Sequence, residues 1–163
     1  MAELVCESQS LEQTLEFGRA FASCLRFRDV VALIGDLGAG KTHLVQAIAS
    51  SLGADLSEVN SPTFVLIQEY DADIPILHID AYRLRDTDEF LELGADELLG
   101  GENVCLIEWA DRVADVLPRH RIEIRIDSTG ATCRKLTVSG DAGRLRKIHG
   151  RLSPEMNSEF IDG

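Results

Sequence analysis

Residues 35–43 read GDLGAGKTH and match the phosphate-binding pattern G-x-x-x-x-G-K-[ST], known as Walker A. In such a P-loop, backbone N–H groups of a glycine-rich turn converge on phosphate oxygens at the start of a helix. Lys41 is placed to reach the β and γ phosphates, and Thr42 to bring its hydroxyl to Mg²⁺. We therefore predict contacts with a bound nucleotide from Asp36, Leu37, Gly38, Ala39, Gly40, Lys41, Thr42 and His43.

The segments on either side of this loop have the patterns of a strand and a helix. Residues 30–34, VVALI, form an apolar run that ends at Gly35, which is typical of a strand buried on both faces in a parallel sheet. After the loop, apolar residues recur every fourth position from Leu44 to Leu52, and Gly53 is a plausible end for this helix. A strand, a glycine loop and a helix in this order are the context that a P-loop requires.

The rest of the chain alternates between expected helices and strands. A helix is expected at 11–25, and the acidic segment DTDEFLEL is helix-prone. The segments HRIEIRID and ATCRKLTVS flank residues 128–130 and alternate in polarity, as the strands of an antiparallel hairpin do. Further strands are expected at 64–70, 74–80 and 104–108.

This alternation predicts an α/β fold. At 163 residues the chain has the size of one domain, and we expect a single P-loop NTPase-like three-layer domain at 1–150. Its central sheet is expected to be mainly parallel, with the antiparallel C-terminal hairpin at the edge. Residues 151–163, RLSPEMNSEFIDG, are polar and contain a proline, and we expect them to form a mobile tail.

The charge of the chain bears on its partners. There are 28 Asp and Glu residues against 16 Lys and Arg, a formal net charge of -12, so the surface field repels the backbone of a nucleic acid. Direct binding of tRNA or DNA is therefore disfavoured. A protein partner with a basic face fits this charge, and so does an acidic surface that serves only solubility.

The cysteines and the N-terminus indicate the compartment. The four cysteines contain no CxxC pair, and they have no histidine beside them at metal-ligand spacing, so they are expected to be buried thiols in a reducing compartment. The N-terminus MAELVCESQS has no basic region followed by an apolar core, and the run VVALI is too short to cross a bilayer. The sequence predicts a cytoplasmic protein without a membrane segment.

Two carboxylates follow apolar strands and are candidates for the chemistry of a nucleotide site. Asp80 ends the stretch ILHID and Glu108 ends VCLIE, and in open α/β sheets such strand ends are where ligands bind. A carboxylate there could hold Mg²⁺ and its waters. Each could equally cap the helix that follows.

Two further features lie near these positions. Thr63 belongs to SPTF, residues 61–64, where a hydroxyl could meet the γ phosphate or the metal when ATP is bound, although an ordinary Ser-Pro turn has the same pattern. Trp109, the one tryptophan, follows Glu108 and could contact the base, a partner or the core. The guanine-recognition element N-K-x-D does not occur in the sequence, which favours adenine as the base. A kinase lid would usually be rich in arginine, and the sequence has no such segment between the loop and Glu108, which favours hydrolysis over phosphoryl transfer to another molecule.

The segments GDLGAGKT, SPTF, HIDAYRL and CLIEWADR occur in the order and spacing of the bacterial TsaE (YjeE) ATPases, and this resemblance covers residues 11–126. It implies a cytosolic Mg²⁺-dependent ATPase that converts ATP to ADP during synthesis of threonylcarbamoyladenosine, the modified nucleoside beside the anticodon of tRNA. The resemblance also implies that the protein docks on a TsaB–TsaD pair to support multiple turnover. It would hydrolyse ATP weakly alone, be stimulated by the pair and reach tRNA only through it.

The resemblance also assigns roles to residues. It places Trp109 near the nucleotide. Of the acidic pair, Asp80 would contact a water bound to the metal and Glu108 would orient the attacking water, and the reverse assignment stays open. The implied catalytic residues are Lys41, Thr63, Asp80 and Glu108, and the implied metal ligands are Thr42, Asp80 and Glu108.

Two positions depart from the family pattern. His43 stands where relatives have a second threonine whose hydroxyl can contact the α phosphate, and Ala110 replaces a proline after the tryptophan. Two other function classes stay open. One is a binding module that ATP gates, with incidental hydrolysis. The other is a small-molecule kinase.

Overall fold

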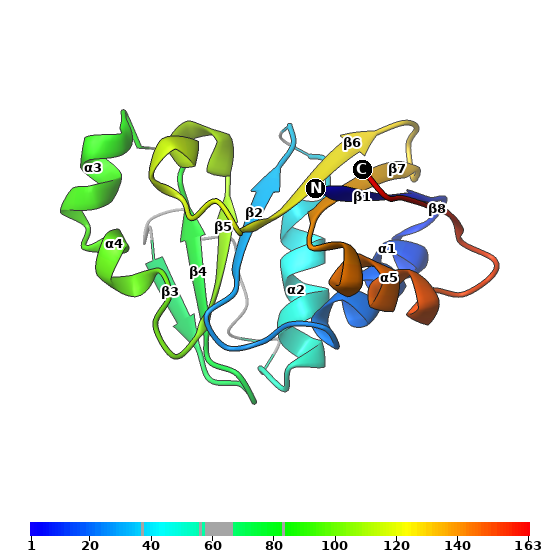
Figure 1. Ribbon diagram of the computed structural model, residues 1–163, viewed down its shortest axis with the longest axis horizontal. Helices are drawn as coiled ribbons and strands as arrows, with labels where there is room; N and C mark the ends of the chain where they lie inside the picture. Colours follow the sequence, from blue (N-terminus) through cyan, green and yellow to red (C-terminus); the bar gives the residue numbers. More distant parts are fainter. Residues whose placement is uncertain (37, 56, 58–66, 83) are drawn as a thin grey trace.

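The computed structural model describes residues 1–36, 38–55, 57, 67–82 and 84–163 (Figure 1). These residues form one eight-stranded sheet in the order β3-β4-β5-β2-β6-β7-β1-β8. The strands are β1 (Ala2–Ser8), β2 (Val30–Ile34), β3 (Ile67–Tyr70), β4 (Ile76–Asp80), β5 (Val104–Glu108), β6 (Ile122–Ser128), β7 (Arg134–Gly140) and β8 (Asn157–Ile161). The helices are α1 (Leu11–Ala22), α2 (Lys41–Ser51), α3 (Thr87–Glu92), α4 (Ala95–Leu98), the 3₁₀ helix η2 (Ala110–Val116) and α5 (Ala142–Arg151).

The sheet has a parallel core with antiparallel strands on both sides. Strands β4, β5, β2 and β6 pair in parallel, and β3 lies antiparallel to β4 at one edge. On the other side β7, β1 and β8 each add antiparallel. The predicted α/β class is thus confirmed, and the predicted hairpin is β6–β7. Two strands that the sequence did not predict, β1 and β8, extend the sheet beyond this hairpin.

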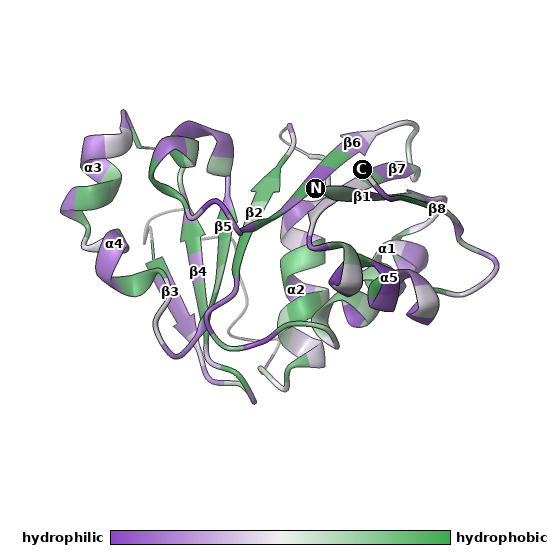
Figure 2. Ribbon diagram, viewed as in Figure 1, coloured by the Kyte–Doolittle hydropathy of each residue, from purple (hydrophilic) through white to green (hydrophobic). Residues whose placement is uncertain are grey.

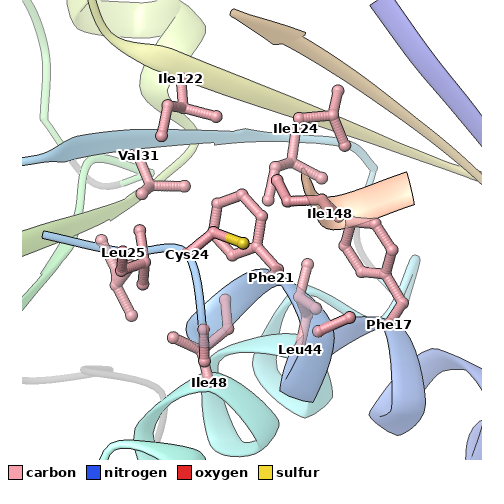
Figure 3. Packing of buried hydrophobic residues seen from close by; sticks show 14 of the residues in the cluster. Phe17, Phe21, Cys24, Leu25, Val31, Leu44, Ile48, Ile122, Ile124 and Ile148 are labelled. Atoms are coloured by element: carbon pink, nitrogen blue, oxygen red, sulfur yellow. The ribbon is translucent and has the colours of Figure 1, made fainter. Parts of the chain in front are cut away.

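Helices cover the two faces of the sheet and complete three layers. Side chains of α1, α2 and α5 pack on one face and form the first core cluster, where Figure 3 shows Phe17, Leu44 and Ile148 against Val31 and Ile124 among others. The second core cluster, under α3, α4 and η2, lies on the opposite face of β2, β4 and β5. Figure 2 shows these three strands as largely hydrophobic, whereas α3 and α5 carry hydrophilic residues.

The close approach of α1 and α2 depends on one glycine. A Cβ atom on Gly18 of α1 would lie 2.5 Å from the Cβ of Ala47 on α2, closer than two carbon atoms can pack. Because α2 begins directly at the P-loop, this contact fixes the helix that carries the loop.

The expectation of a mobile tail at 151–163 is wrong. Helix α5 runs to Arg151, and Asn157–Ile161 is strand β8, paired along β1 from Glu3↔Ile161 to Glu7↔Asn157. Strand β1 would otherwise leave its outer N–H and C=O groups unpaired, and β8 satisfies them. Phe160 packs against the first core cluster, so the segment belongs to the domain. No helix in the described ranges is long and apolar enough to cross a membrane.

Candidate nucleotide site

The loop between β2 and α2 has the backbone of a phosphate cradle. Gly38 and Gly40 have φ values of 79° and 103°, a left-handed conformation that glycine adopts without strain. A Cβ on Gly35 would meet the carbonyl oxygen of Ile126 at 2.6 Å, so a glycine is required there as well. Gly40 precedes α2 and supplies no side-chain cap, so the first N–H groups of this helix remain available to an anion.

Lys41, the first residue of α2, lies with its side chain against this loop. Its side chain is 5% exposed, and its Nζ donates hydrogen bonds to the carbonyl oxygens of Gly35 and Asp36. The ammonium group also lies 4.3 Å from the centre of the Trp109 ring. Burial lowers the pKa of Lys41, while negative charges, first of all that of Glu108, oppose this shift.

The two predicted carboxylates lie side by side at the carboxyl ends of two neighbouring strands. Strands β4 and β5 pair in parallel with Asp80 opposite Glu108, and these side chains are buried, with residue exposures of 8% and 3%. Oδ1 of Asp80 accepts from the backbone N–H of Tyr82 at 2.9 Å, which holds the turn after β4. The negative charges of Glu108 and, more weakly, Asp80 raise the pKa of Lys41 against the effect of burial, because both carboxylates lie near its ammonium group.

The oxygen atoms of Thr42, Asp80 and Glu108 suit a hard cation that keeps several of its own water ligands. Across the described part of the chain, no group of three or more His, Cys, Asp and Glu side chains could hold a metal ion. A hydroxyl at Thr42 and the pair Asp80 and Glu108 supply only oxygen donors, and Mg²⁺ typically takes one or two carboxylates together with waters and phosphate oxygens. These residues therefore fit Mg²⁺ that arrives with a nucleotide.

Arg134 ties the loop to the β6–β7 turn, and sequence reasoning missed it. Its Nε donates to the carbonyl oxygen of Ala39 at 2.8 Å, and its Nη1 to those of Cys133 at 2.8 Å and Gly130 at 3.1 Å. A longer contact of 3.4 Å joins Nη2 to the oxygen of Gly38. No sequence motif marks this arginine, because its partner on the loop, the backbone carbonyl of Ala39, lies 95 residues away along the chain.

A cavity of about 200 Å³ opens beside the loop, between the start of α1 and the β6–β7 turn. It is lined by Leu11, Thr14, Ala39, Gly40, His43, Ala131, Thr132 and Arg134. His43 is exposed at this cavity. The exchange of the usual threonine for His43 therefore changes the wall of a space that adjoins the phosphate loop.

Trp109 stands between the site and the second core cluster. Its backbone is left-handed, with φ 58° and ψ 37°, an uncommon conformation for a bulky residue. Its ring packs on Tyr82, with 4.9 Å between ring centres, and on the second core cluster, and the Lys41 ammonium group lies over the ring. Ala110, in place of the family's proline, is buried as the first residue of η2. The predicted residues Leu37 and Thr63, with the whole SPTF segment, lie outside the described residues.

Comparison with known protein families matches residues 8–136 to the family described as "Threonylcarbamoyl adenosine biosynthesis protein TsaE". The match spans most of the chain and includes the loop, both carboxylates and Arg134. The chain belongs to the TsaE family. It is thus a P-loop NTPase-like protein of a family that acts in threonylcarbamoyladenosine biosynthesis.

Relatives of the TsaE family cover nearly all of this chain. A protein of Bacillus subtilis (strain 168) named "tRNA threonylcarbamoyladenosine biosynthesis protein TsaE" is 37% identical over 158 residues, which are 96% of this chain and 98% of that protein. The protein of the same name from Treponema pallidum (strain Nichols) is 37% identical over 134 residues, 82% of this chain and 98% of that protein. The crystal structure of Bacillus subtilis YdiB superposes with a TM-score of 0.75 at 32% identity and covers 95% of this chain and 97% of that one.

Proposed function

We propose that this TsaE-family chain is a cytoplasmic, Mg²⁺-dependent ATPase that converts ATP to ADP and phosphate. It would act on a TsaB–TsaD complex and support repeated rounds of threonylcarbamoyladenosine synthesis on tRNA. The observation that carries the proposal is the convergence of Lys41, Asp80 and Glu108 at the open N-terminus of α2.

Each part of this site has a task in phosphoryl transfer to water. The amides of the loop and Lys41 hold the phosphates and offset the charge that develops on them. Thr42 and a carboxylate would hold Mg²⁺, which would supply neutralisation of the phosphate charge. Glu108 would orient the attacking water and accept its proton, and Asp80 would hold a water of the Mg²⁺ shell; the reverse assignment of the two carboxylates stays open. From the family resemblance, Thr63 would sense the γ phosphate.

The cavity beside the loop supports a nucleoside triphosphate rather than free phosphate. It adjoins Ala39 and Gly40, next to the phosphate cradle. Its lining combines leucine and alanine side chains with those of threonine, His43 and Arg134, and this mixture suits a base or ribose. The net charge of -12 supports access to tRNA through the TsaB–TsaD complex instead of by direct contact.

The test is ATP hydrolysis by the wild-type chain and by Glu108→Ala, each with and without TsaB–TsaD. Stimulation by the complex that disappears in the variant supports a partner-activated ATPase. Absence of stimulation in a reconstituted pathway that is otherwise active would overturn the proposal. A Glu108→Gln protein that binds ATP normally and still sustains repeated modification would instead show a binding module that ATP gates.

A further inference from the structure

A line of buried polar side chains crosses three neighbouring strands and ends at Glu108. Tyr70 of β3 donates its hydroxyl hydrogen to Oε1 of Gln68 at 2.6 Å, and the same hydroxyl lies 3.1 Å from Nδ1 of His78 on β4. On the other side of the ring, Nε2 of His78 lies 2.6 Å from Oε2 of Glu108 on β5. The mechanism proposed above leaves His78 without a task.

His78 occupies a place where an apolar residue would be expected. It is 0% exposed and lies in the middle of β4, whose five residues are all buried. Side chains alternate along a strand, so His78 shares a face with Ile76 and Asp80, which is the face of the first core cluster and of α2. A buried polar ring is unfavourable unless it is hydrogen-bonded, and both of its nitrogens have partners here.

The donors and acceptors available to these side chains decide which group donates to Glu108. An ionised Glu108 can only accept, so Nε2 of His78 must carry the hydrogen between them. If Tyr70 donates to Gln68, its oxygen accepts from Nδ1, and the ring then carries a hydrogen on both nitrogens and is positively charged. A flip of the Gln68 amide reverses the Tyr70 hydroxyl without moving a heavy atom, and Nδ1 then accepts. In both arrangements His78 donates to Oε2 of Glu108.

We propose that His78, braced by Tyr70, is a positioning residue that fixes the Glu108 carboxylate for ATP hydrolysis. It occupies Oε2 and thereby leaves Oε1 for the attacking water or the metal. Residues that hydrogen-bond to a carboxylate of a metal site, without touching the metal or substrate themselves, commonly set the orientation of that carboxylate. This inference rests on the proposed ATPase function of the site.

Two substitutions at position 78 separate positioning from packing. In glutamine, Nε2 lies as many bonds from Cα as Nε2 of histidine does, so His78→Gln keeps a donor toward Glu108. In asparagine, the amide nitrogen corresponds to Nδ1, so His78→Asn keeps only the contact toward Tyr70. Both variants put an amide into the same buried place, and a general loss of packing would affect them alike. Thermal unfolding of the two proteins controls for this loss.

With TsaB–TsaD present, His78→Asn is expected to lower kcat for ATP hydrolysis by about 10- to 100-fold, the usual effect of losing such a partner. The KM for ATP should stay near its wild-type value, and so should the affinity for ADP without Mg²⁺, followed by the fluorescence of Trp109, the one tryptophan. His78→Gln should recover most of kcat. Equal kcat values for the asparagine and glutamine variants would overturn the positioning role.

A spectroscopic measurement tests the contact without any turnover. In the ¹H–¹⁵N spectrum of the imidazole groups, His78→Gln identifies the signal of the hydrogen on Nε2 among the four histidines. Glu108→Gln should shift this signal strongly, whereas Glu123→Gln should not. A signal that Glu108→Gln leaves in place would overturn the inference. The two proposals can also fail separately. If Glu108→Gln shifts the signal but the wild-type chain does not hydrolyse ATP with TsaB–TsaD, the ATPase proposal is overturned together with the catalytic task of the contact. The hydrogen bond between His78 and Glu108 would still stand.

Discussion

The two halves of the sheet are built on different patterns. Strands β4 and β5 in the parallel half are buried at every residue, and polar side chains enter this half chiefly at strand ends and at His78. The other half of the sheet, called the wing, consists of β6, β7, β1 and β8; it is antiparallel throughout, apart from the parallel pairing of β6 with β2 that joins it to the parallel half. Its strands β1, β6 and β7 alternate buried residues with more exposed ones because only one face carries helices. The parallel half therefore holds the candidate chemistry, while the wing packs beside it.

The largest effect that tests this division is the loss of a carboxylate in the parallel half. Glu108→Gln should lower kcat for ATP hydrolysis with TsaB–TsaD by about 10²- to 10⁴-fold, the range for removal of a group that handles the proton. The matched control is Glu123→Gln on β6, whose carboxylate pairs with Arg121 at 2.7 Å and is 33% exposed. We expect it to keep kcat. A comparable loss in both variants would contradict the division between the halves.

Helix α5 carries two ion pairs of the same length that differ in exposure, one to each half of the sheet. Arg144 lies 2.6 Å from Asp29, just before β2, with side-chain exposures of 12% and 15%, while Arg146 lies 2.6 Å from Asp162, after β8, with exposures of 57% and 59%. Asp29→Asn leaves a buried guanidinium without its counter-charge and should lower the free energy of unfolding by about 3 kcal/mol. Asp162→Asn should lower it by less than about 1 kcal/mol. Urea unfolding measures both, and equal values would show that burial does not set the difference.

Contact between α1 and α2 tests whether the loop helix depends on close packing. Gly18→Ala places a methyl group 2.5 Å from the Cβ of Ala47 and should lower the free energy of unfolding by about 1–3 kcal/mol through overpacking. Gly150→Ala on α5 has nothing within 4 Å of the new Cβ and should leave stability unchanged or raise it by about 0.4–1 kcal/mol. Thermal unfolding checks the pair. A stable Gly18→Ala protein would mean that the two helices can separate without loss.

The sequence predicted the features of the parallel half that depend on neighbours along the chain. The apolar run of β2, the glycine loop and the start of α2 are local patterns, and the structure has all three. The strand ends at Asp80 and Glu108 were readable for the same reason. That these residues lie opposite each other follows from the register of β4 and β5, which the sequence does not state.

The missed features depend on partners far away in the chain. The first residues, AELVCES, do alternate in polarity, but their strand exists because β7 and β8 pair on either side. In α5 only Leu145 and Ile148 are buried apolar side chains of the helix, too few to reveal a helix by periodicity. The His78–Glu108 contact was missed because it depends on which strands are neighbours, although a histidine within an apolar strand was a usable signal.

Arg134 is the point at which the wing reaches into the site, and it gives the smallest expected effect. Its fork of donors holds the carbonyl oxygens of Ala39 on the loop and of Cys133 and Gly130 on the turn. Arg134→Lys keeps the positive charge but cannot donate to the loop and the turn at the same time as the guanidinium group does. The loop should therefore become less ordered although the net charge of the protein is unchanged. We expect the Kd for ADP to rise roughly fivefold, which corresponds to about 1 kcal/mol.

The control for this substitution is Arg125→Lys, on the exposed face of β6 in the same wing. Isothermal titration of ADP into both variants separates a local effect on the loop from a general effect of altered arginines. If Arg134→Lys binds ADP as tightly as Arg125→Lys does, the loop is fixed by its glycines and by Lys41 alone. The wing would then serve only to cover the core, because its contact with the phosphate loop through Arg134 would have no consequence for binding.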